Sequence, residues 1–390
     1  MSNIYCPAIH EDLMLDFTEH RKQDLVVYQP CCLMSNPDNE TRKIKVPIQN
    51  NFFIDDPYLT TIREKNENNE WLTECGQCYN SEKYNMESKR HQLVNIRDRK
   101  ISEGLDFSDK TLLKTMTLTL NAVCDLMCTT CSPQWSSTWL TNTQKSNVKS
   151  YVKDEYLRRH ANGGSFSNKT IMDFFDNINL TGLQQITFTG GETVTFDYFE
   201  MIDYFISKCN DPTNLSIIFQ TNGVRVISEK YLDKLSKLRS VEVSVSTDCI
   251  EDKFEYLRRG ANWENALNNI LYYKQLSIDN KWFYISLEQT ISVLSLLYRH
   301  QLVDLAKKHD IEYREHLAFD VYSLEAMSNE YIEALMSDQS LAQYIGIAID
   351  TKNTKCMNYF LDHIKWYDET TGSDWRKTFP EIAQFYSDYI

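Results

Sequence analysis

From residue 115 onward the chain alternates between two patterns of apolar and polar positions. Short segments rich in Val, Ile, Leu, Phe and Thr predict strands, and longer segments with apolar residues at helical spacing predict helices. Strands are predicted at 115–121, 185–189, 215–220, 241–245, 283–291 and 312–319. Helices are predicted at 197–209, 229–238, 263–275 and 297–308, and a long, partly helical segment at 136–162. Strands that alternate with helices indicate a parallel sheet, so the predicted fold class is α/β.

The first hundred residues do not follow this alternation. A strand is predicted at 24–29 and a short polar helix at 58–69, and segments rich in Asn, Asp and Pro between them indicate turns. Residues 325–390 have a helical pattern and many aromatic residues. We therefore predict a small loop-rich domain at 1–100, a core domain at 101–320 and a helical C-terminal cap at 321–390.

Composition and charge exclude several classes of protein. The net charge of −14 and the pI of about 5.1 disfavour a nucleic-acid partner, because an acidic surface repels phosphate. No apolar run approaches the roughly 20 residues of a membrane-spanning helix, and residues 1–16 lack the basic and apolar parts of a signal peptide. We therefore expect a cytoplasmic protein with no membrane partner. In that compartment the 11 cysteines indicate metal ligands rather than disulfides.

Three of these cysteines directly follow the first core strand. Cys124, Cys128 and Cys131 have CxxxCxxC spacing, and three thiolates can bind three irons of a cubane cluster while the fourth iron stays open. A structural zinc site would need four ligands, usually in paired CxxC units, which this spacing fits poorly. The remaining alternative is that the three cysteines are unrelated buried residues.

This motif resembles the cluster motif of the radical S-adenosylmethionine (SAM) enzymes. The resemblance implies a partial (β/α)6 barrel of TIM type and a [4Fe–4S] cluster whose open iron binds SAM. It also implies reductive cleavage of SAM to methionine and a 5′-deoxyadenosyl radical, which abstracts hydrogen from a substrate, and an electron donor such as flavodoxin or ferredoxin. Thr130 stands where the family commonly has an aromatic residue near the adenine.

Further candidate residues follow the core strands, where barrels of this kind place their functional groups. Gly190, Gly191 and Glu192 end the second strand, and the resemblance implies that this segment binds the SAM amino group. Taken alone, a Gly-Gly pair at a strand end can simply be a turn. Asn222, after the third strand, is a further candidate for the SAM pocket.

The fourth strand ends at a second candidate group. Ser246 and Asp248 are two residues apart, so an extended backbone points both side chains the same way, which suits the ribose diol of SAM. The alternative is a turn built on the Asp side chain. Arg258 resembles a family arginine that pairs with the SAM carboxylate, with Arg259 as a rival and a helix-surface arginine as the structural alternative.

The N-terminal segment carries a second set of cysteines. Cys6, either Cys31 or Cys32, Cys75 and Cys78 together make four thiolates, which could bind zinc or a second iron–sulfur cluster. Their order resembles the auxiliary-cluster module of SPASM- or twitch-type radical SAM proteins, many of them from phages and marine bacteria. That module usually follows the barrel, whereas here it precedes it. The resemblance favours a second [4Fe–4S] cluster, with zinc or no metal as alternatives.

The substrate is not specified by any motif. Auxiliary-cluster radical SAM enzymes often act on peptides, so a peptide is the leading expectation. The alternatives are a small metabolite or sugar, or a non-catalytic iron–sulfur protein for electron transfer or binding. The sequence does not assign a catalytic acid, base or hydrogen donor.

Overall fold

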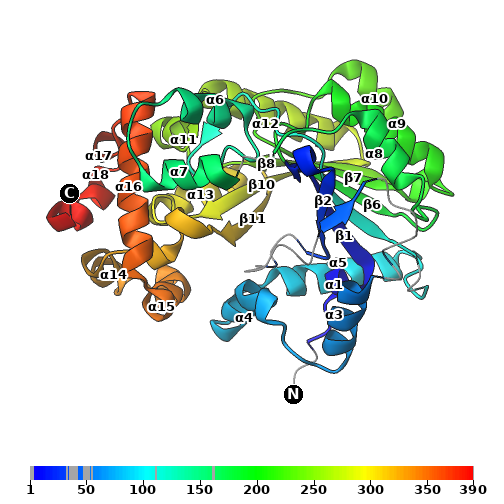
Figure 1. The fold of residues 1–390 in the computed structure, drawn as a ribbon, viewed down its shortest axis with the longest axis horizontal. Coiled ribbons are helices and arrows are strands. Elements are labelled where there is room, and N and C mark those ends of the chain that lie inside the picture. Colours follow the sequence, from blue (N-terminus) through cyan, green and yellow to red (C-terminus); the bar gives the residue numbers. More distant parts are fainter. Residues whose placement is uncertain are drawn as a thin grey trace. The chain divides into compact units, whose positions relative to one another are not determined.

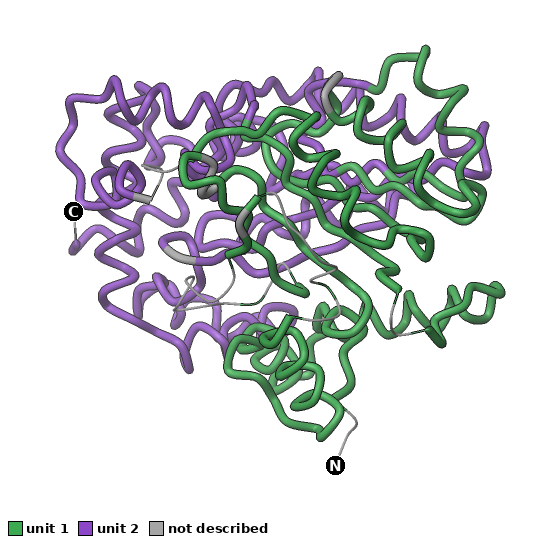
Figure 2. The backbone as a smooth tube through the Cα atoms, turned by 45° about the vertical axis from the view of Figure 1, so that its right-hand side comes forward, with its two compact units in different colours: residues 1–122, 162–219, 227–242 green, residues 123–161, 220–226, 243–390 purple. Residues whose placement is uncertain are grey.

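The computed structural model describes residues 4–31, 34, 43–46, 53, 56–109, 112–159 and 163–389. The chain forms two compact units (Figure 2). Unit 1 comprises residues 1–122, 162–219 and 227–242, and unit 2 comprises residues 123–161, 220–226 and 243–390.

Unit 1 is built on a mainly parallel sheet (Figure 1). Its strands follow the order β7 (Ser216–Thr221), β6 (Gln185–Thr189), β4 (Thr115–Thr119), β1 (Asp12–His20), β2 (Leu25–Gln29) and β3 (Lys43–Lys45). The first four are parallel to one another, and β2 and β3 add an antiparallel edge. In β1, Leu13, Leu15 and Phe17 occupy alternate positions and are fully buried, so one face of this strand packs into the core.

Some helices of unit 1 begin at a capping side chain, and one of them packs against β1 through aromatic side chains. They are α1 (Pro7–Glu11), α3 (Pro57–Glu67), α4 (Gly76–Lys83), α5 (Lys89–Ser102), α8 (Asn168–Phe175), α9 (Phe196–Lys208) and α10 (Glu229–Leu235). Asp56 and Ser88 accept hydrogen bonds from the first turns of α3 and α5, which satisfies amides that have no partner within the helix. Phe17 of β1 contacts Phe174 of α8 edge to face, at 5.4 Å between ring centres.

Unit 2 continues the alternation of strands and helices. Its strands are β8 (Ser240–Ser246), β10 (Phe283–Ile291) and β11 (Glu312–Leu317). Residues 243–246 of β8 belong to this unit, and residues 240–242 belong to unit 1. Strands β10 and β11 are parallel. A separate two-stranded ladder joins β5 (Met127–Cys128) to β9 (Arg258–Arg259) in antiparallel register.

Ten helices within the described part of unit 2 accompany these strands. They are α6 (Ser137–Lys145), α7 (Tyr151–Arg159), α11 (Glu251–Leu257), α12 (Trp263–Asp279), α13 (Arg299–Lys308), α14 (Asn329–Leu335), α15 (Ala342–Thr351), α16 (Thr354–Thr371), α17 (Trp375–Thr378) and α18 (Pro380–Ala383). Figure 1 shows α16 as the long orange helix of the C-terminal part. Its Trp366 and Tyr367 are fully buried, so the aromatic residues of this part form a core.

The predicted α/β fold is confirmed, and its large, mainly parallel sheet is consistent with a partial barrel. All six predicted core strands are present, within a few residues of the predicted bounds. Residues 136–162 contain two helices, α6 and α7, and the C-terminal part is helical as predicted. The sequence pattern did not predict β1, α4 or α5. Within the described residues, no helix has both the length and the apolar character needed to cross a lipid bilayer.

Candidate metal and cofactor site

The three cysteines of the CxxxCxxC motif lie on one loop of unit 2. Burial raises the pKa of Cys131 to about 12, and the nearby Cys124 adds to the rise. Burial also raises the pKa of Cys128 despite the opposing charge of Arg258, and Cys131 and Cys124 add to that rise. The thiols therefore influence one another electrostatically, and each would release its proton to solvent on becoming a metal ligand.

Side chains of α6 hold the backbone of the cysteine loop. They donate hydrogen bonds to three of its carbonyl groups: Thr138 to Cys124 at 2.8 Å, Ser136 to Leu126 at 2.6 Å, and the Trp139 indole to Cys128 at 2.7 Å. Ser136 also accepts a hydrogen bond from the Trp139 amide as the N-cap of α6. The start of this helix therefore fixes the loop that carries the thiols.

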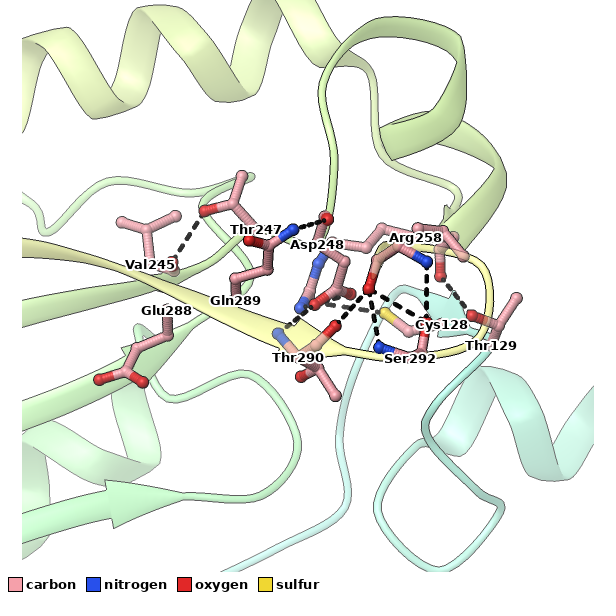
Figure 3. A network of polar contacts seen from close by, with 12 residues as sticks. Cys128, Thr129, Val245, Thr247, Asp248, Arg258, Glu288, Gln289, Thr290 and Ser292 are labelled. Atoms are coloured by element: carbon pink, nitrogen blue, oxygen red, sulfur yellow. Dashed lines mark hydrogen bonds and ion pairs between the residues drawn. The ribbon is translucent and has the colours of Figure 1, made fainter. Parts of the chain in front are cut away.

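Arg258 links the cysteine loop to the end of β8, as Figure 3 shows. Its Nη1 donates to Cys128 Sγ at 3.8 Å, and its Nη2 lies 3.0 Å from Asp248 Oδ2. Both charged side chains are nearly inaccessible to solvent, 8% exposed for Arg258 and 2% for Asp248. Burial alone would lower the pKa of Arg258, but Asp248 and Cys128 raise it above its ordinary value.

Asp248 is also held from β10. The backbone amide of Thr290 donates to Asp248 Oδ1 at 3.0 Å, and the Gln289 side chain donates to the Asp248 carbonyl at 2.7 Å (Figure 3). Asp248 Oδ2 and Arg258 Nε are buried, and neither atom makes a hydrogen bond of good geometry with the described residues, although Asp248 Oδ2 lies in the ion pair with Arg258 Nη2. Buried polar atoms normally find partners, so these two atoms leave hydrogen-bonding capacity that fits a polar cofactor beside the thiols.

Asn222 approaches the first cysteine of the motif. Its Nδ2 lies 3.9 Å from Cys124 Sγ and 3.2 Å from Asp125 Oδ1. Asp125 in turn pairs with Arg225, at 3.0 Å between Oδ2 and Nη2. The sequence singled out Asn222 but not Asp125 or Arg225, because neither belongs to a recognisable motif.

Gly190, Gly191 and Glu192 form a tight turn at the end of β6 in unit 1. Both glycines have positive φ, 74° and 57°, a conformation that costs other residues about 1–2 kcal/mol. A Cβ on Gly190 would lie 2.3 Å from Thr119 Cγ2, so only glycine fits this position. Glu192 is buried and accepts a hydrogen bond from the Val194 amide at 2.9 Å.

The N-terminal cysteines share one pocket in unit 1. Cys6, Cys31, Cys75 and Cys78 line one pocket together with Arg90 and several apolar residues. Burial raises the pKa of Cys6 to about 11 and that of Cys75 to about 12. The alternative ligand Cys32 lies outside the described residues.

Hydrogen bonds fix the walls of this pocket. The Asn66 side chain of α3 accepts from the Cys6 amide at 3.1 Å and donates to the Ile4 carbonyl at 3.0 Å. Arg90 of α5 pairs with Glu82 of α4 at 2.7 Å. In the described part of the chain, no three His, Cys, Asp or Glu side chains are arranged around a single metal ion. What favours a metal centre at each cysteine set is that thiols bind iron and zinc, and that the cysteines of each set share one pocket or one loop.

Comparison with known families identifies the segment that carries the motif. Residues 118–288 match the sequence profile of the radical SAM superfamily. This segment includes Cys124, Cys128, Cys131, Asp248 and Arg258. The match covers less than half of the chain, and the radical SAM superfamily implies a [4Fe–4S] cluster and SAM as cofactors. No curated protein matches the chain.

Several solved structures resemble the chain. One is anSMEcpe with bound AdoMet (SAM), at 17% identity and a TM-score of 0.39, covering 63% of this chain and 60% of that one. The same protein with AdoMet and the Cp18Cys peptide matches at 17% identity and a TM-score of 0.37, covering 63% and 62%. SuiB of Streptococcus suis bound to S-adenosylmethionine matches at 14% identity and a TM-score of 0.39, covering 74% and 60%. The chain therefore spans about 60% of the length of these structures.

Proposed function

We propose that this chain uses its radical SAM domain to cleave SAM and abstract hydrogen from a peptide. Cys124, Cys128 and Cys131 would hold the [4Fe–4S] cluster, which when bound supplies the electron that cleaves SAM to methionine and a 5′-deoxyadenosyl radical. The observation that carries the proposal is that three thiols at CxxxCxxC spacing lie on one loop, braced by α6, within residues 118–288.

The chain's own contribution is to position ligands and to exclude water. Three side chains of α6 hold the loop carbonyls, so little backbone freedom is lost when the thiolates bind iron. Arg258 and Asp248 are buried, which strengthens the electrostatic interactions between them and with Cys128.

The SAM contacts stay predictions. Gly190, Gly191 and Glu192 are proposed for the amino group, Ser246 and Asp248 for the ribose, and Arg258 for the carboxylate, with Asn222 beside the cluster. The unaligned atoms Asp248 Oδ2 and Arg258 Nε support a polar ligand near the last two. Because Asp248 already pairs with Arg258, each would share its charge between its partner and SAM.

A second [4Fe–4S] cluster is proposed at Cys6, Cys31, Cys75 and Cys78. Two features support this: four thiols line one pocket, and their order resembles the auxiliary-cluster module. Zinc is the rival, because it also binds four thiolates.

The peptide substrate rests on the resemblance to auxiliary-cluster enzymes, and a flavodoxin or ferredoxin is the proposed electron donor. A small metabolite or sugar is the rival substrate. A short peptide encoded beside this chain's gene should raise 5′-deoxyadenosine formation when it is added to the reaction. The mass of the peptide itself should change. If the peptide is unchanged while a metabolite or sugar is modified, the peptide assignment is wrong.

Anaerobic assay tests the catalytic proposal. Reconstituted protein incubated with SAM and dithionite should release 5′-deoxyadenosine, measured by chromatography and mass spectrometry. Protein that holds its cluster but releases none would instead be an iron–sulfur protein for electron transfer or binding.

A further inference from the structure

Arg258 contacts the cysteine loop through both backbone and side chain. In the β5–β9 ladder Arg258 is the direct partner of Cys128, and next to it the Thr129 amide donates to the Leu257 carbonyl at 2.8 Å. Gly260 follows with φ of 102°, and a Cβ there would lie 3.2 Å from the Asp125 carbonyl oxygen. The arginine segment is thus pressed against the cysteine loop, and the guanidinium–thiol contact is built into the fold.

We propose that Arg258 and Asp248 are an opposed pair of charges that sets the reduction potential of the cluster. The inference rests on the proposed function for the presence of a cluster at Cys128. Arg258 acts on it through the hydrogen bond from Nη1 to Cys128 Sγ, and Asp248 acts through its ion pair with Arg258. This effect on the potential is separate from the SAM contacts proposed above for both residues.

Reduction adds one negative charge to the cluster, and this charge determines whether each residue raises or lowers the reduction potential. One electron from the donor makes the cluster and its thiolates more negative. A cation beside a ligand sulfur, and a hydrogen bond to that sulfur, stabilise the reduced form and raise the potential. The carboxylate of Asp248 opposes this effect. Because both side chains are buried, solvent screens neither charge strongly.

The ion pair also keeps the arginine in place. Asp248 is anchored by the Thr290 amide of β10, so the guanidinium is fixed between a rigid carboxylate and the thiol. Without Asp248, Arg258 would be a buried cation whose positive charge acts on the cluster unopposed. Without Arg258, the buried carboxylate would face the cluster alone.

A redox titration of reconstituted full-length protein without SAM tests this inference. The EPR signal of the reduced cluster, assigned as the one that Cys128→Ala removes, is followed against potential. Arg258→Gln should make reduction at least tenfold less favourable, which is a shift of ~59 mV to more negative potential. Asp248→Asn should shift the potential the opposite way.

Arg259→Gln is the matched control. Arg259 is the exposed neighbour in β9, and its Nη2 donates to the Thr371 carbonyl, so its replacement should leave the potential unchanged. Arg258→Lys keeps the charge but loses the planar fork, and should shift the potential less than Arg258→Gln. If Arg258→Gln does not fold, Arg258→Lys and Asp248→Asn still decide the sign.

The outcomes separate this inference from the function on which it rests. Opposite shifts for Arg258→Gln and Asp248→Asn support the inference. Equal potentials, or shifts of the same sign, overturn it while leaving the catalytic proposal intact. A change that arises only when SAM is added also overturns it, since the two residues would then act on SAM alone. A wild type without any iron–sulfur signal refutes the proposed function itself.

Discussion

His363 of α16 is a neutral imidazole enclosed by aromatic rings. It is 0% exposed, and rings of Trp139 and Trp366 lie within 5.6 Å between ring centres. Its Nδ1 lies 3.0 Å from the Tyr322 hydroxyl, while its Nε2 has no partner within the described residues. Burial lowers the pKa of His363 to about 3, so the folded protein holds this side chain uncharged at neutral pH.

Acid should therefore destabilise the fold through His363. Between its unfolded pKa of about 6.5 and its folded pKa of about 3, the unfolded chain binds a proton that the folded chain does not. Stability contributed above pH 6.5 is lost as the pH falls, by about 2 kcal/mol between pH 7 and pH 5. Denaturant unfolding at both pH values should show that His363→Phe loses less stability on acidification than the wild type.

Tyr322→Phe is the control for this prediction, because it removes the hydroxyl partner but keeps the imidazole. It should lower stability at both pH values and leave the acid dependence as in the wild type. An acid dependence that is the same in His363→Phe and wild type would contradict the buried, neutral state of His363.

For single residues, the sequence predicted which side chains could bind iron or form a turn better than it predicted which side chains contact one another. Cysteine spacing and the Gly-Gly pair were recognisable because few residue types can bind iron or adopt positive φ. That Asp248 faces Arg258 was not predictable, because their approach depends on a ladder between β5 and β9, which are distant in the chain. Cys31 lines the pocket and Cys32 lies outside the described residues, so both stay candidate ligands.

Helix α16 reaches the cysteine loop from the C-terminal part of unit 2. The Tyr367 hydroxyl lies 2.9 Å from the Met127 carbonyl oxygen and 3.1 Å from that of Tyr256. With the contacts from α6, this interaction completes the support of the loop around Cys128. The helical C-terminal part is therefore more than a cover for the sheet, since one of its helices braces the candidate cluster site.

Tyr367→Phe should loosen the cluster. Removing the hydroxyl removes its hydrogen bonding to the Met127 and Tyr256 carbonyl groups, which costs about 0.5–1.5 kcal/mol. The loop should then open more often, so cluster absorbance should decay faster in the presence of an iron chelator. Tyr386→Phe is the matched control, because its hydroxyl is buried and donates to the Ala326 carbonyl at 3.0 Å, away from the loop. Equal decay rates in the two variants would show that α16 does not brace the loop.

Among the elements, the core strands were predicted from their clean periodicity, whereas β1 and α5, which have mixed patterns, were not predicted. The core strands are flanked by turn residues and are rich in β-branched and aromatic side chains. In β1, Asp12 and Asp16 obscure the pattern, although Asp16 is buried and accepts hydrogen bonds from Thr18. Charged residues along α5 hide its helical face, yet Arg90 and Arg97 make ion pairs there with Glu82 and Glu11.

For the whole molecule, the proposal is one metal centre in each compact unit. Unit 1 holds the four-cysteine pocket and unit 2 holds the CxxxCxxC loop. The N-terminal cysteines belong to the same compact unit as the core strands β4, β6 and β7. Strand β1 joins the N-terminal segment to these strands, because it pairs with β4. The domain boundary predicted near residue 100 stays a prediction.

Iron and zinc analysis tests the pair of metal centres. Two [4Fe–4S] clusters predict about eight irons per chain. Replacing Cys75 and Cys78 by Ala should remove about four irons and lower the stability of unit 1, because a bound metal contributes folding free energy. Cys356→Ala is the control, since this α16 cysteine belongs to neither set.

A structural zinc predicts another result. The wild type would then hold about four irons and one zinc, and the double variant would lose only the zinc. About four irons with no zinc in the wild type would refute both assignments of the N-terminal pocket.

The most direct test of the central claim compares wild type with Cys124→Ala, Cys128→Ala, Cys131→Ala and the triple variant in the same assay. Each is reconstituted with iron and sulfide, reduced anaerobically with dithionite and supplied with SAM, and 5′-deoxyadenosine is measured. Each thiolate holds one of three anchored irons, so every variant should lose the cluster and produce no 5′-deoxyadenosine above the protein-free background. Formation of 5′-deoxyadenosine at a rate near that of the wild type in the triple variant would contradict the account.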